Sequence, residues 1–465
     1  MIEITPFLNP STSEPLYMQL YSYIKKEIQH GKIEPGMKLP SKRKLSIHLR
    51  ISQHTVETAY QQLIAEGYVE SKPRKGLYVN SIHEDIFPNN TPLPKVVKRE
   101  SLVQNNHYKI DFSHGKVALE NFPYSVWRKL TVQGLHDDQL FFNGDRQGEL
   151  TLRGEIAKYL YQSRGVRCSA EQIVIGAGTQ YLIGLLTMVI GRDSIYSMED
   201  PGFHRTRVAF KDQGVTLKAI PLDEEGINLE QLKNSKANVT YVTPSHQFPN
   251  GIVMPIARRL DLLKWAAESN GFIIEDDYDG EFRYKGKPIP SLQGLDPNGR
   301  VIYLGTFSKS LIPSLRISFM VLPKEILASY QSHFTIYKQT VSRLHQYTLY
   351  EFMKNGHWDR HLNKMRTTYR KKQKTLIQLI DEYFGNNVIM IGDDSGLHIL
   401  LNVRNEMSEQ ELINAAAEKE VKIYPTSIYY ENYIHDLAPK VLLGFAGLMD
   451  NEIKQGIQLL KEAWF

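Results

Sequence analysis

The sequence predicts a small α+β domain of three helices and a two-stranded hairpin, followed by a large α/β domain. The large domain is expected to have a mainly parallel sheet and a small C-terminal α/β lobe. Apolar residues recur at helical spacing in the first 80 residues, and short β-branched runs alternate with helical stretches from about residue 109. At 465 residues the chain also exceeds the length that one hydrophobic core usually organises.

The composition excludes several classes of protein. Hydrophobic residues make up 42% of the chain, and no run approaches the roughly 20 apolar residues that a membrane span needs. The single cysteine, Cys168, excludes an internal disulfide and a cysteine-based metal cluster. The first residues lack the pattern of a signal peptide, so we expect a cytoplasmic protein with no membrane contact and no metal.

Positive charge is concentrated in the small domain. Residues 1–80 hold 11 Lys/Arg against 7 Asp/Glu, which is +4 of the net charge of +5. This excess indicates a phosphate-binding face, although an ordinary lysine-rich surface would give the same count.

The helices of the small domain are predicted from their apolar faces and their end signals. The first helix begins after Pro15 and ends at Gly31, the second is capped by Ser41, and the third ends at Gly67. Strands at 68–71 and 77–79 then flank a basic tip. The expected apolar faces are Leu16, Leu20, Ile24 and Ile28, then Leu45 and Leu49, then Val56, Ala59, Tyr60, Leu63 and Ile64.

A short helix, a turn and a second amphipathic helix predict a helix-turn-helix, whose second helix enters the major groove of double-stranded DNA. Polar and basic side chains suited to base edges and phosphates surround the turn and the hairpin tip. The alternative is that they are solvated faces of a small helical domain. The candidates are Lys42, Arg43, Arg50, Ser52, Gln53, His54, Thr55, Arg74 and Lys75.

Residues 81–108 are predicted to be a linker, because prolines interrupt any periodicity and the apolar content is low. The large domain then runs from 109 to 465. Its expected strands are 172–175, 194–198, 239–242, 272–274, 301–304 and 317–322. Most are followed by polar or glycine-rich clusters, which should converge on one ligand site at the carboxyl ends of the strands.

Lys309 is the candidate for a reactive amine at that site, since it directly follows a buried strand. Asp276 could pair with a protonated pyridine nitrogen, and Tyr278 could reach a ring hydroxyl. Phosphate donors are expected from side chains near Lys309 and from backbone N–H groups that open a helix. They are Ser308, Ser310 and Arg316, together with Ala177, Gly178 and Thr179.

Segments 39–45, 52–56 and 60–68 resemble the winged-helix DNA-binding domain of GntR-type regulators. The resemblance implies DNA contacts from Arg43, from the first residues of the third helix and from Gly76 at the wing tip. Many relatives have arginine where this chain has Gln53, which would favour adenine over guanine.

Residues 110–465 resemble fold-type-I aminotransferases, most closely at 243–249, 274–279 and 305–311, and the whole chain resembles the MocR subfamily of GntR-type regulators. The resemblance implies that pyridoxal 5′-phosphate forms an internal aldimine with Lys309. It also implies that Asp276 holds the pyridine nitrogen, Tyr278 contacts the phenolic oxygen, and Phe203 lies against the ring. A homodimer is implied as well.

Two departures from the aminotransferase pattern bear on function. Phe248 stands where these enzymes usually have an asparagine that binds the ring oxygen, and Gly447 supplies no charge where amino-acid-binding relatives have an arginine. Arg205 or Arg207 could anchor an effector carboxylate instead. We expect a sensor of an amine, an amino acid, a dipeptide or pyridoxal phosphate itself. The alternatives are a working aminotransferase with a DNA-binding head and a colourless dimerisation scaffold.

Overall fold

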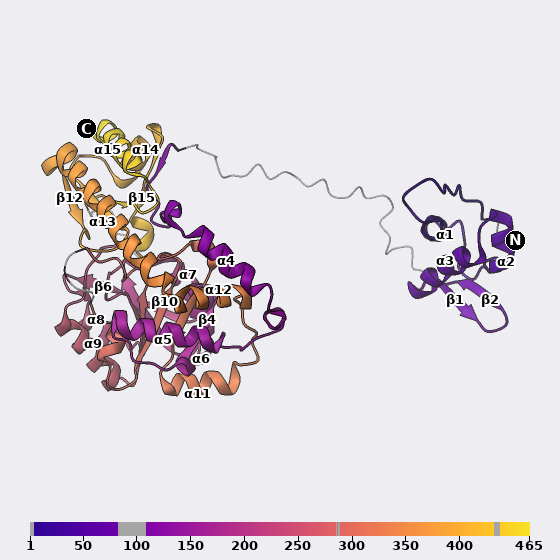
Figure 1. The fold of residues 1–465 in the computed structure, drawn as a ribbon, viewed down its shortest axis with the longest axis horizontal. Helices are drawn as coiled ribbons and strands as arrows, with labels where there is room; N and C mark the ends of the chain where they lie inside the picture. Colours follow the sequence, from indigo (N-terminus) through magenta and orange to yellow (C-terminus); the bar gives the residue numbers. More distant parts are fainter. Residues whose placement is uncertain (1–3, 82–107, 285, 287–288, 432–437) are drawn as a thin grey trace. The chain divides into compact units, whose positions relative to one another are not determined.

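A computed structural model describes residues 4–81, 108–284, 286, 289–431 and 438–465. The chain forms two compact units, Met1–Gln104 and Asn105–Phe465 (Figure 1). The predicted linker, 81–108, falls almost wholly outside the described residues. Within the described part of the chain, no helix is both long and apolar enough to cross a membrane.

The first unit contains three helices and an antiparallel hairpin, as predicted. Ser41 Oγ accepts a hydrogen bond from the Lys44 N–H (3.3 Å), and Ser52 Oγ accepts one from the Thr55 N–H (3.0 Å). Each cap satisfies an N–H group that would otherwise lack a partner in the first helical turn. The elements are α1 (Leu16–Gln29), α2 (Lys42–Leu49), α3 (Gln53–Ala65), β1 (Val69–Lys72) and β2 (Gly76–Val79).

The core of this unit forms where the three helices meet the hairpin. Leu20, Ile24, Val56 and Leu63 are fully buried there, in line with the expected apolar faces. Ile64 departs from the expectation, because its side chain remains 37% exposed. It follows Leu63 directly on α3, and successive residues of a helix point about 100° apart.

The second unit is built on an eight-stranded sheet with the order β4-β11-β10-β9-β8-β5-β6-β7. Neighbours from β10 through β9, β8 and β5 to β6 are parallel, whereas β11 and β7 run antiparallel to their neighbours. The strands are β4 (Ile173–Gly176), β5 (Ile195–Asp200), β6 (Thr216–Asp223), β7 (Gly226–Ile227), β8 (Val239–Val242), β9 (Phe272–Asp277), β10 (Val301–Thr306) and β11 (Ser318–Val321). Strand β6 was not predicted from the sequence.

Helices cover both faces of this sheet, because its buried strands carry apolar residues on both sides. One face packs mainly against α5, α9 and α12, and the other packs mainly against α6, α7 and α11. The helices of this part are α4 (Tyr124–Gly134), α5 (Leu150–Arg164), α6 (Thr179–Ile190), α7 (His204–Asp212), α8 (Leu229–Asn234), α9 (Ile256–Glu268), α10 (Leu292–Leu295), α11 (Lys324–His333) and α12 (Arg343–Lys354).

A long helix leads into the C-terminal lobe, which is the small α/β lobe that the sequence predicts. The lobe has a four-stranded sheet with the order β12-β13-β16-β15, and a short parallel pair joins β3 to β14. Its elements are α13 (His357–Phe384), β12 (Val388–Ile391), β13 (His398–Val403), α14 (Glu409–Glu418), β14 (Val421–Lys422), β15 (Tyr424–Pro425), β16 (Lys440–Gly444) and α15 (Asp450–Trp464), with β3 at Ile110–Asp111.

The burial of neighbouring residues on α3 predicts opposite outcomes for two substitutions in the first unit. Leu63→Ala should destabilise this unit by about 2–5 kcal/mol, because it leaves a cavity in the core. Ile64→Ala should change its stability by less than about 0.5 kcal/mol. Hydrogen–deuterium exchange of the α1 and α3 amides in the intact chain measures both, and equal protection in the two variants would contradict the assigned face.

Candidate functional site

A cavity of about 170 Å³ lies at the carboxyl edge of the large sheet, where the polar clusters were expected to meet. Residues from five strands or their following loops line it. They are Thr179 and Gln180 after β4; Phe203, Arg205 and Thr206 after β5; Asp276 and Tyr278 from β9; Thr306, Ser308 and Lys309 from β10; and Arg316 and Ser318 at the start of β11.

Lys309 brings a primary amine into this cavity. Its Nζ donates a hydrogen bond to the backbone carbonyl of His114. The pKa of Lys309 is lowered to about 8, mainly by burial; the Asp279 carboxylate opposes this shift, and the positive charge of Arg205 adds to it. More of this amine than of an ordinary lysine is therefore unprotonated near neutral pH, and the unprotonated form is the one that attacks a carbonyl carbon.

Asp276 supplies a carboxylate to the same cavity from β9. The Tyr241 hydroxyl donates a hydrogen bond to Asp276 Oδ2, yet burial raises the pKa of Asp276 to about 7. A nearby cation strongly stabilises the charged form of a buried carboxyl group whose pKa is raised. Asp276 is therefore suited to bind a protonated ring nitrogen.

The start of α6 offers a place for an anion at one end of the cavity. Gly178 precedes this helix with a φ of +94°, and a Cβ there would lie 2.0 Å from Arg316 Nη2. Only glycine lets the arginine come this close to the helix N-terminus, where N–H groups attract anions. Ser308 lies nearby, and its Oγ accepts a hydrogen bond from Thr306 Oγ1 at 3.2 Å.

Two of the expected phosphate donors, Ser310 and Ala177, do not have the surroundings that were predicted for them. Ser310 is fully buried, is not among the cavity residues, and its Oγ has no hydrogen-bond partner in the described part of the chain. The Ala177 N–H donates to Thr340 Oγ1 at 3.0 Å.

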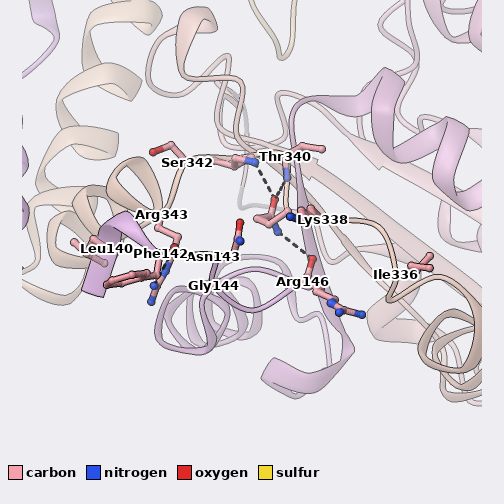
Figure 2. Close-up of a pocket in the computed structure, with 12 residues that line it drawn as sticks. Leu140, Phe142, Asn143, Gly144, Arg146, Ile336, Lys338, Thr340, Ser342 and Arg343 are labelled. Carbon is pink, nitrogen blue, oxygen red and sulfur yellow. Dashed lines mark hydrogen bonds between the residues drawn. The ribbon is translucent and has the colours of Figure 1, made fainter. Parts of the chain in front are cut away.

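Thr340 also belongs to a second, larger cavity of about 460 Å³, lined by residues of segments 140–146 and 336–343 (Figure 2). No pattern in the sequence indicated this cavity.

Phe203 and Tyr278 form an aromatic wall of the cavity, and Phe248 packs against both rings without lining the cavity itself. Phe203 stacks on Phe248, with the ring centres 4.0 Å apart and the planes 5° apart, and it meets Tyr278 edge-on at 4.8 Å. Phe248 is fully buried in an apolar cluster that also contains Tyr429 and Leu442. This wall therefore presents no amide to a ligand at the Phe248 position.

The two expected effector anchors have different surroundings. Arg205 lines the cavity. Arg207 is buried away from it and is bound by Asp200 (3.1 Å), by Glu431 (3.4 Å) and by the carbonyl oxygen of Tyr429 (2.6 Å). Gly447 is not among the cavity residues, and a Cβ there would lie 2.4 Å from the Cβ of Lys116.

The DNA-binding candidates lie on the surface of the first unit, and all except the half-buried Thr55 are exposed. Lys42 forms an ion pair with Glu57 on α3. Ser52 caps α3, so Gln53, His54 and Thr55 form its first turn. The remaining candidates are Arg43 on α2, Arg50 at its end, and Arg74, Lys75 and Gly76 in the hairpin.

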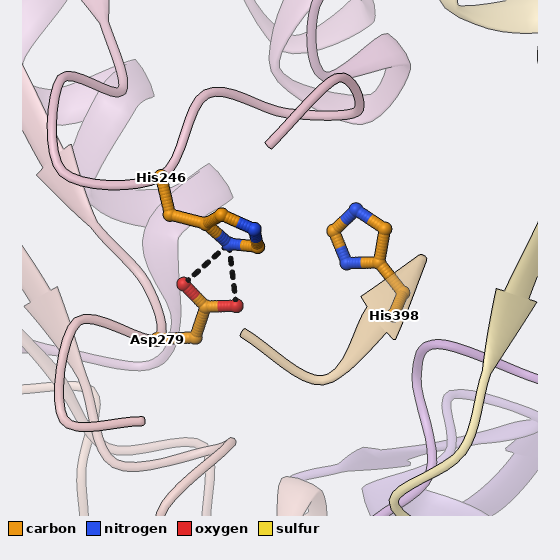
Figure 3. Close-up of side chains that lie close together, drawn as sticks. All are labelled: His246, Asp279 and His398. Carbon is orange, nitrogen blue, oxygen red and sulfur yellow. Dashed lines mark hydrogen bonds and ion pairs between the residues drawn. The ribbon is translucent and has the colours of Figure 1, made fainter. Parts of the chain in front are cut away.

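Sequence reasoning missed several polar groups of the site. Thr306 and Ser318 form a hydroxyl chain with Ser308, and Tyr241 reaches Asp276 from β8. Figure 3 shows a buried group of His246, Asp279 and His398. Tyr278 contacts this group through His246. Thr306 and His246 belong to the polar clusters that follow β10 and β8, so their position after a strand was the available signal.

These residues fit a phosphorylated pyridine aldehyde. The Lys309 amine is suited to bind the aldehyde carbon, Asp276 the ring nitrogen, and Tyr278 a ring hydroxyl. The Gly178–Arg316 contact and the start of α6 provide a cradle for a phosphate.

Comparisons with known proteins assign both units. Residues 16–79 match the gntR family of bacterial regulatory proteins, and residues 108–460 match aminotransferase class I and II. The chain is 48% identical over 465 residues to the uncharacterized HTH-type transcriptional regulator YdeL of Bacillus subtilis (strain 168), covering 100% of both chains. It is 30% identical to the "Probable rhizopine catabolism regulatory protein MocR" of Rhizobium meliloti, covering 98% of this chain and 95% of that one.

A solved structure with a similar fold is the kynurenine aminotransferase of Pyrococcus horikoshii. It has a TM-score of 0.68 and 26% sequence identity, and the alignment covers 82% of this chain and 97% of that one. The aminotransferase class I and II domain implies pyridoxal 5′-phosphate as the cofactor of the second unit, in agreement with the residues of the cavity. The GntR-type head and the aminotransferase-like domain in one chain place it in the MocR subfamily of GntR-type transcriptional regulators.

Proposed function

We propose that this regulator senses a small amine-bearing ligand, or pyridoxal 5′-phosphate itself, at the Lys309 cavity and thereby changes the DNA binding of its head. The observation that carries the proposal is a buried amine of lowered pKa in a cofactor cavity, on the same chain as a winged helix. The alternative is an active aminotransferase with a DNA-binding head.

The residues of the cavity have separate roles in this proposal. Bound pyridoxal 5′-phosphate supplies an aldehyde that bonds to primary amines and a ring that withdraws electrons from that bond. Lys309 holds the cofactor, Asp276 keeps the ring nitrogen protonated, and Arg316 with the start of α6 holds the phosphate. Arg205 lies at the cavity as an anchor for an effector carboxylate.

The aromatic wall supports sensing over turnover. Phe248 offers no hydrogen bond to the phenolic oxygen of the ring, and Gly447 brings no charge for a carboxylate. An effector larger than an ordinary α-amino acid, such as a dipeptide, would gain contact area from an apolar wall.

We further propose a cytoplasmic homodimer that binds an operator with two heads. Large exposed apolar side chains support an interface around the cavity of Figure 2: Phe141, Phe142 and Ile336 are 64%, 66% and 75% exposed. Two heads per dimer would read two half-sites, as two-fold symmetric regulators do.

The proposal is tested by recording the visible spectrum and the DNA affinity of the full-length protein with added ligands. The ligands are amino acids, γ-aminobutyrate and D-alanyl dipeptides. A ligand that moves both readouts, without sustained carbonyl product, is the effector. DNA affinity that responds only to pyridoxal phosphate makes the cofactor the signal. Sustained carbonyl product at ordinary enzyme rates establishes the aminotransferase alternative, and a protein that stays colourless with added cofactor rejects both.

Cofactor uptake should depend on pH through Lys309. Only the unprotonated amine reacts, so the rate in the cofactor-free protein should rise with pH and level off above a midpoint near 8. A lysine of ordinary pKa, about 10.4, would give a rate still rising at about pH 9. Stopped-flow absorbance measures the rate, and Lys309→Arg serves as the control that should develop no visible band.

Arg43 should contribute to DNA affinity through phosphate contact. Arg43→Ala should weaken binding to all sequences and reduce the salt dependence of the affinity by about one counterion. Lys32→Ala removes the same charge from a residue that is ion-paired with Glu27 (2.9 Å) and should leave that slope unchanged. Fluorescence anisotropy across a salt series measures both, and equal slopes in the two variants would place the DNA-binding face elsewhere.

A further inference from the structure

Tyr278 contacts a buried histidine–aspartate pair behind the cofactor cavity. Its hydroxyl oxygen lies 2.9 Å from His246 Nδ1, and the two carboxylate oxygens of Asp279 lie 3.1 and 3.0 Å from the same nitrogen. His246 and Asp279 are each only 2% exposed, and Figure 3 shows the carboxylate facing the ring. Three oxygens therefore surround one ring nitrogen.

This arrangement decides which nitrogen of His246 carries a proton. A carboxylate only accepts hydrogen bonds, so a lone pair on Nδ1 would face two negatively charged oxygens at contact distance. Nδ1 must therefore be protonated, whether or not Nε2 also carries a proton. His246 Nε2 has no hydrogen-bond partner among the described residues, so the hydrogen bonds of this ring in that part of the chain are all made at Nδ1.

The protonated Nδ1 also fixes the role of the Tyr278 hydroxyl. The Tyr278 hydroxyl cannot donate its proton to a nitrogen that is already protonated. Its oxygen therefore accepts a hydrogen bond from the Nδ1–H group, and its own proton remains free to donate to another group. Burial, followed by the charges of Asp279 and Asp276, raises the pKa of Tyr278, so the hydroxyl stays protonated. Tyr278 lines the cavity, and its free proton is available to a ligand there.

We propose that His246 and Asp279 are positioning residues that make Tyr278 a hydrogen-bond donor to the phenolic oxygen of the cofactor. This inference rests on the proposed function only for the contact between Tyr278 and that oxygen. It also accounts for Phe248: where that position offers no donor, one tyrosine must hold the oxygen, and a fixed histidine orients the tyrosine.

The neighbouring His398 provides a matched comparison. Its Nε2 donates to the Pro249 carbonyl oxygen at 3.0 Å, and burial, followed by His246, lowers the pKa of His398 to about 3. It is therefore a neutral, buried histidine in the same cluster that has no hydrogen bond to Tyr278.

The test is the pH titration of the visible band in the full-length protein loaded with pyridoxal 5′-phosphate. A donor to the phenolic oxygen stabilises its negative charge and weakens its hold on the proton of the adjacent nitrogen. Losing that donor therefore raises the pKa of the band. Tyr278→Phe and His246→Gln should each raise it by about one unit, a tenfold change in proton affinity. His246→Asn keeps an amide N–H near the Nδ1 position and should stay near wild type.

The double variant separates positioning from a direct effect. If His246 acts through Tyr278, adding His246→Gln to Tyr278→Phe should raise the pKa of the band no further. His398→Asn should leave it within about 0.3 units of wild type, a small part of the unit shift expected from a lost donor. Circular dichroism confirms that each variant is folded, and His246→Ala replaces His246→Gln if the latter does not fold, with the same expected rise in the pKa of the band.

Three outcomes would overturn the inference, and they are distinguishable. An unchanged pKa in Tyr278→Phe means that Tyr278 does not contact the oxygen, so its proposed role in the function fails as well. A shift in Tyr278→Phe without one in His246→Gln removes only the positioning role. About one bound transition metal per chain, with a chelator reproducing the His246→Gln shift, makes His246, Asp279 and His398 a metal site instead.

Discussion

The cofactor site depends on the removal of water from the Lys309 amine. Lys309 Nζ donates a hydrogen bond to the His114 carbonyl oxygen, and burial is the main cause that lowers the pKa of this amine to about 8. Burial also raises the pKa of the Asp276 carboxyl group to about 7, and a cation beside it would stabilise its charged form. The cavity therefore suits a ligand that carries both a protonated ring nitrogen and an anionic group.

The fold and much of the site could be predicted because both depend on local pattern. Alternating strands and helices fix an α/β sheet, and residues that directly follow its parallel strands must meet at one edge. Lys309 and Asp276 were found in this way, Arg316 from its nearness to Lys309 in the sequence, and Phe203 from the resemblance to fold-type-I aminotransferases; all four line the cavity. Strand β6 escaped notice because its residues, with Lys218 and Pro221 among them, do not form a continuous β-branched run.

The rest of the site depends on side-chain direction and tertiary contact, which sequence spacing does not give. Ser308 and Ser310 flank Lys309 alike in sequence, yet the first lines the cavity and the second is fully buried. Arg205 and Arg207 are likewise two residues apart, and only Arg205 lines the cavity. His246 and Asp279 lie in loops that follow two different strands, β8 and β9. Residue spacing does not predict that Asp279 and Tyr278 both contact His246 Nδ1.

The antiparallel strand β11 has a mechanical consequence. Thr306 at the end of β10 pairs with Ser318 at the start of β11, so the loop that carries Lys309 is clamped at both ends by one sheet. The two ends of this loop therefore move only together with the sheet. In the sensing role proposed above, a change in DNA binding is expected to begin in α7, which carries Arg205 at the cavity, and not at the paired ends of the Lys309 loop.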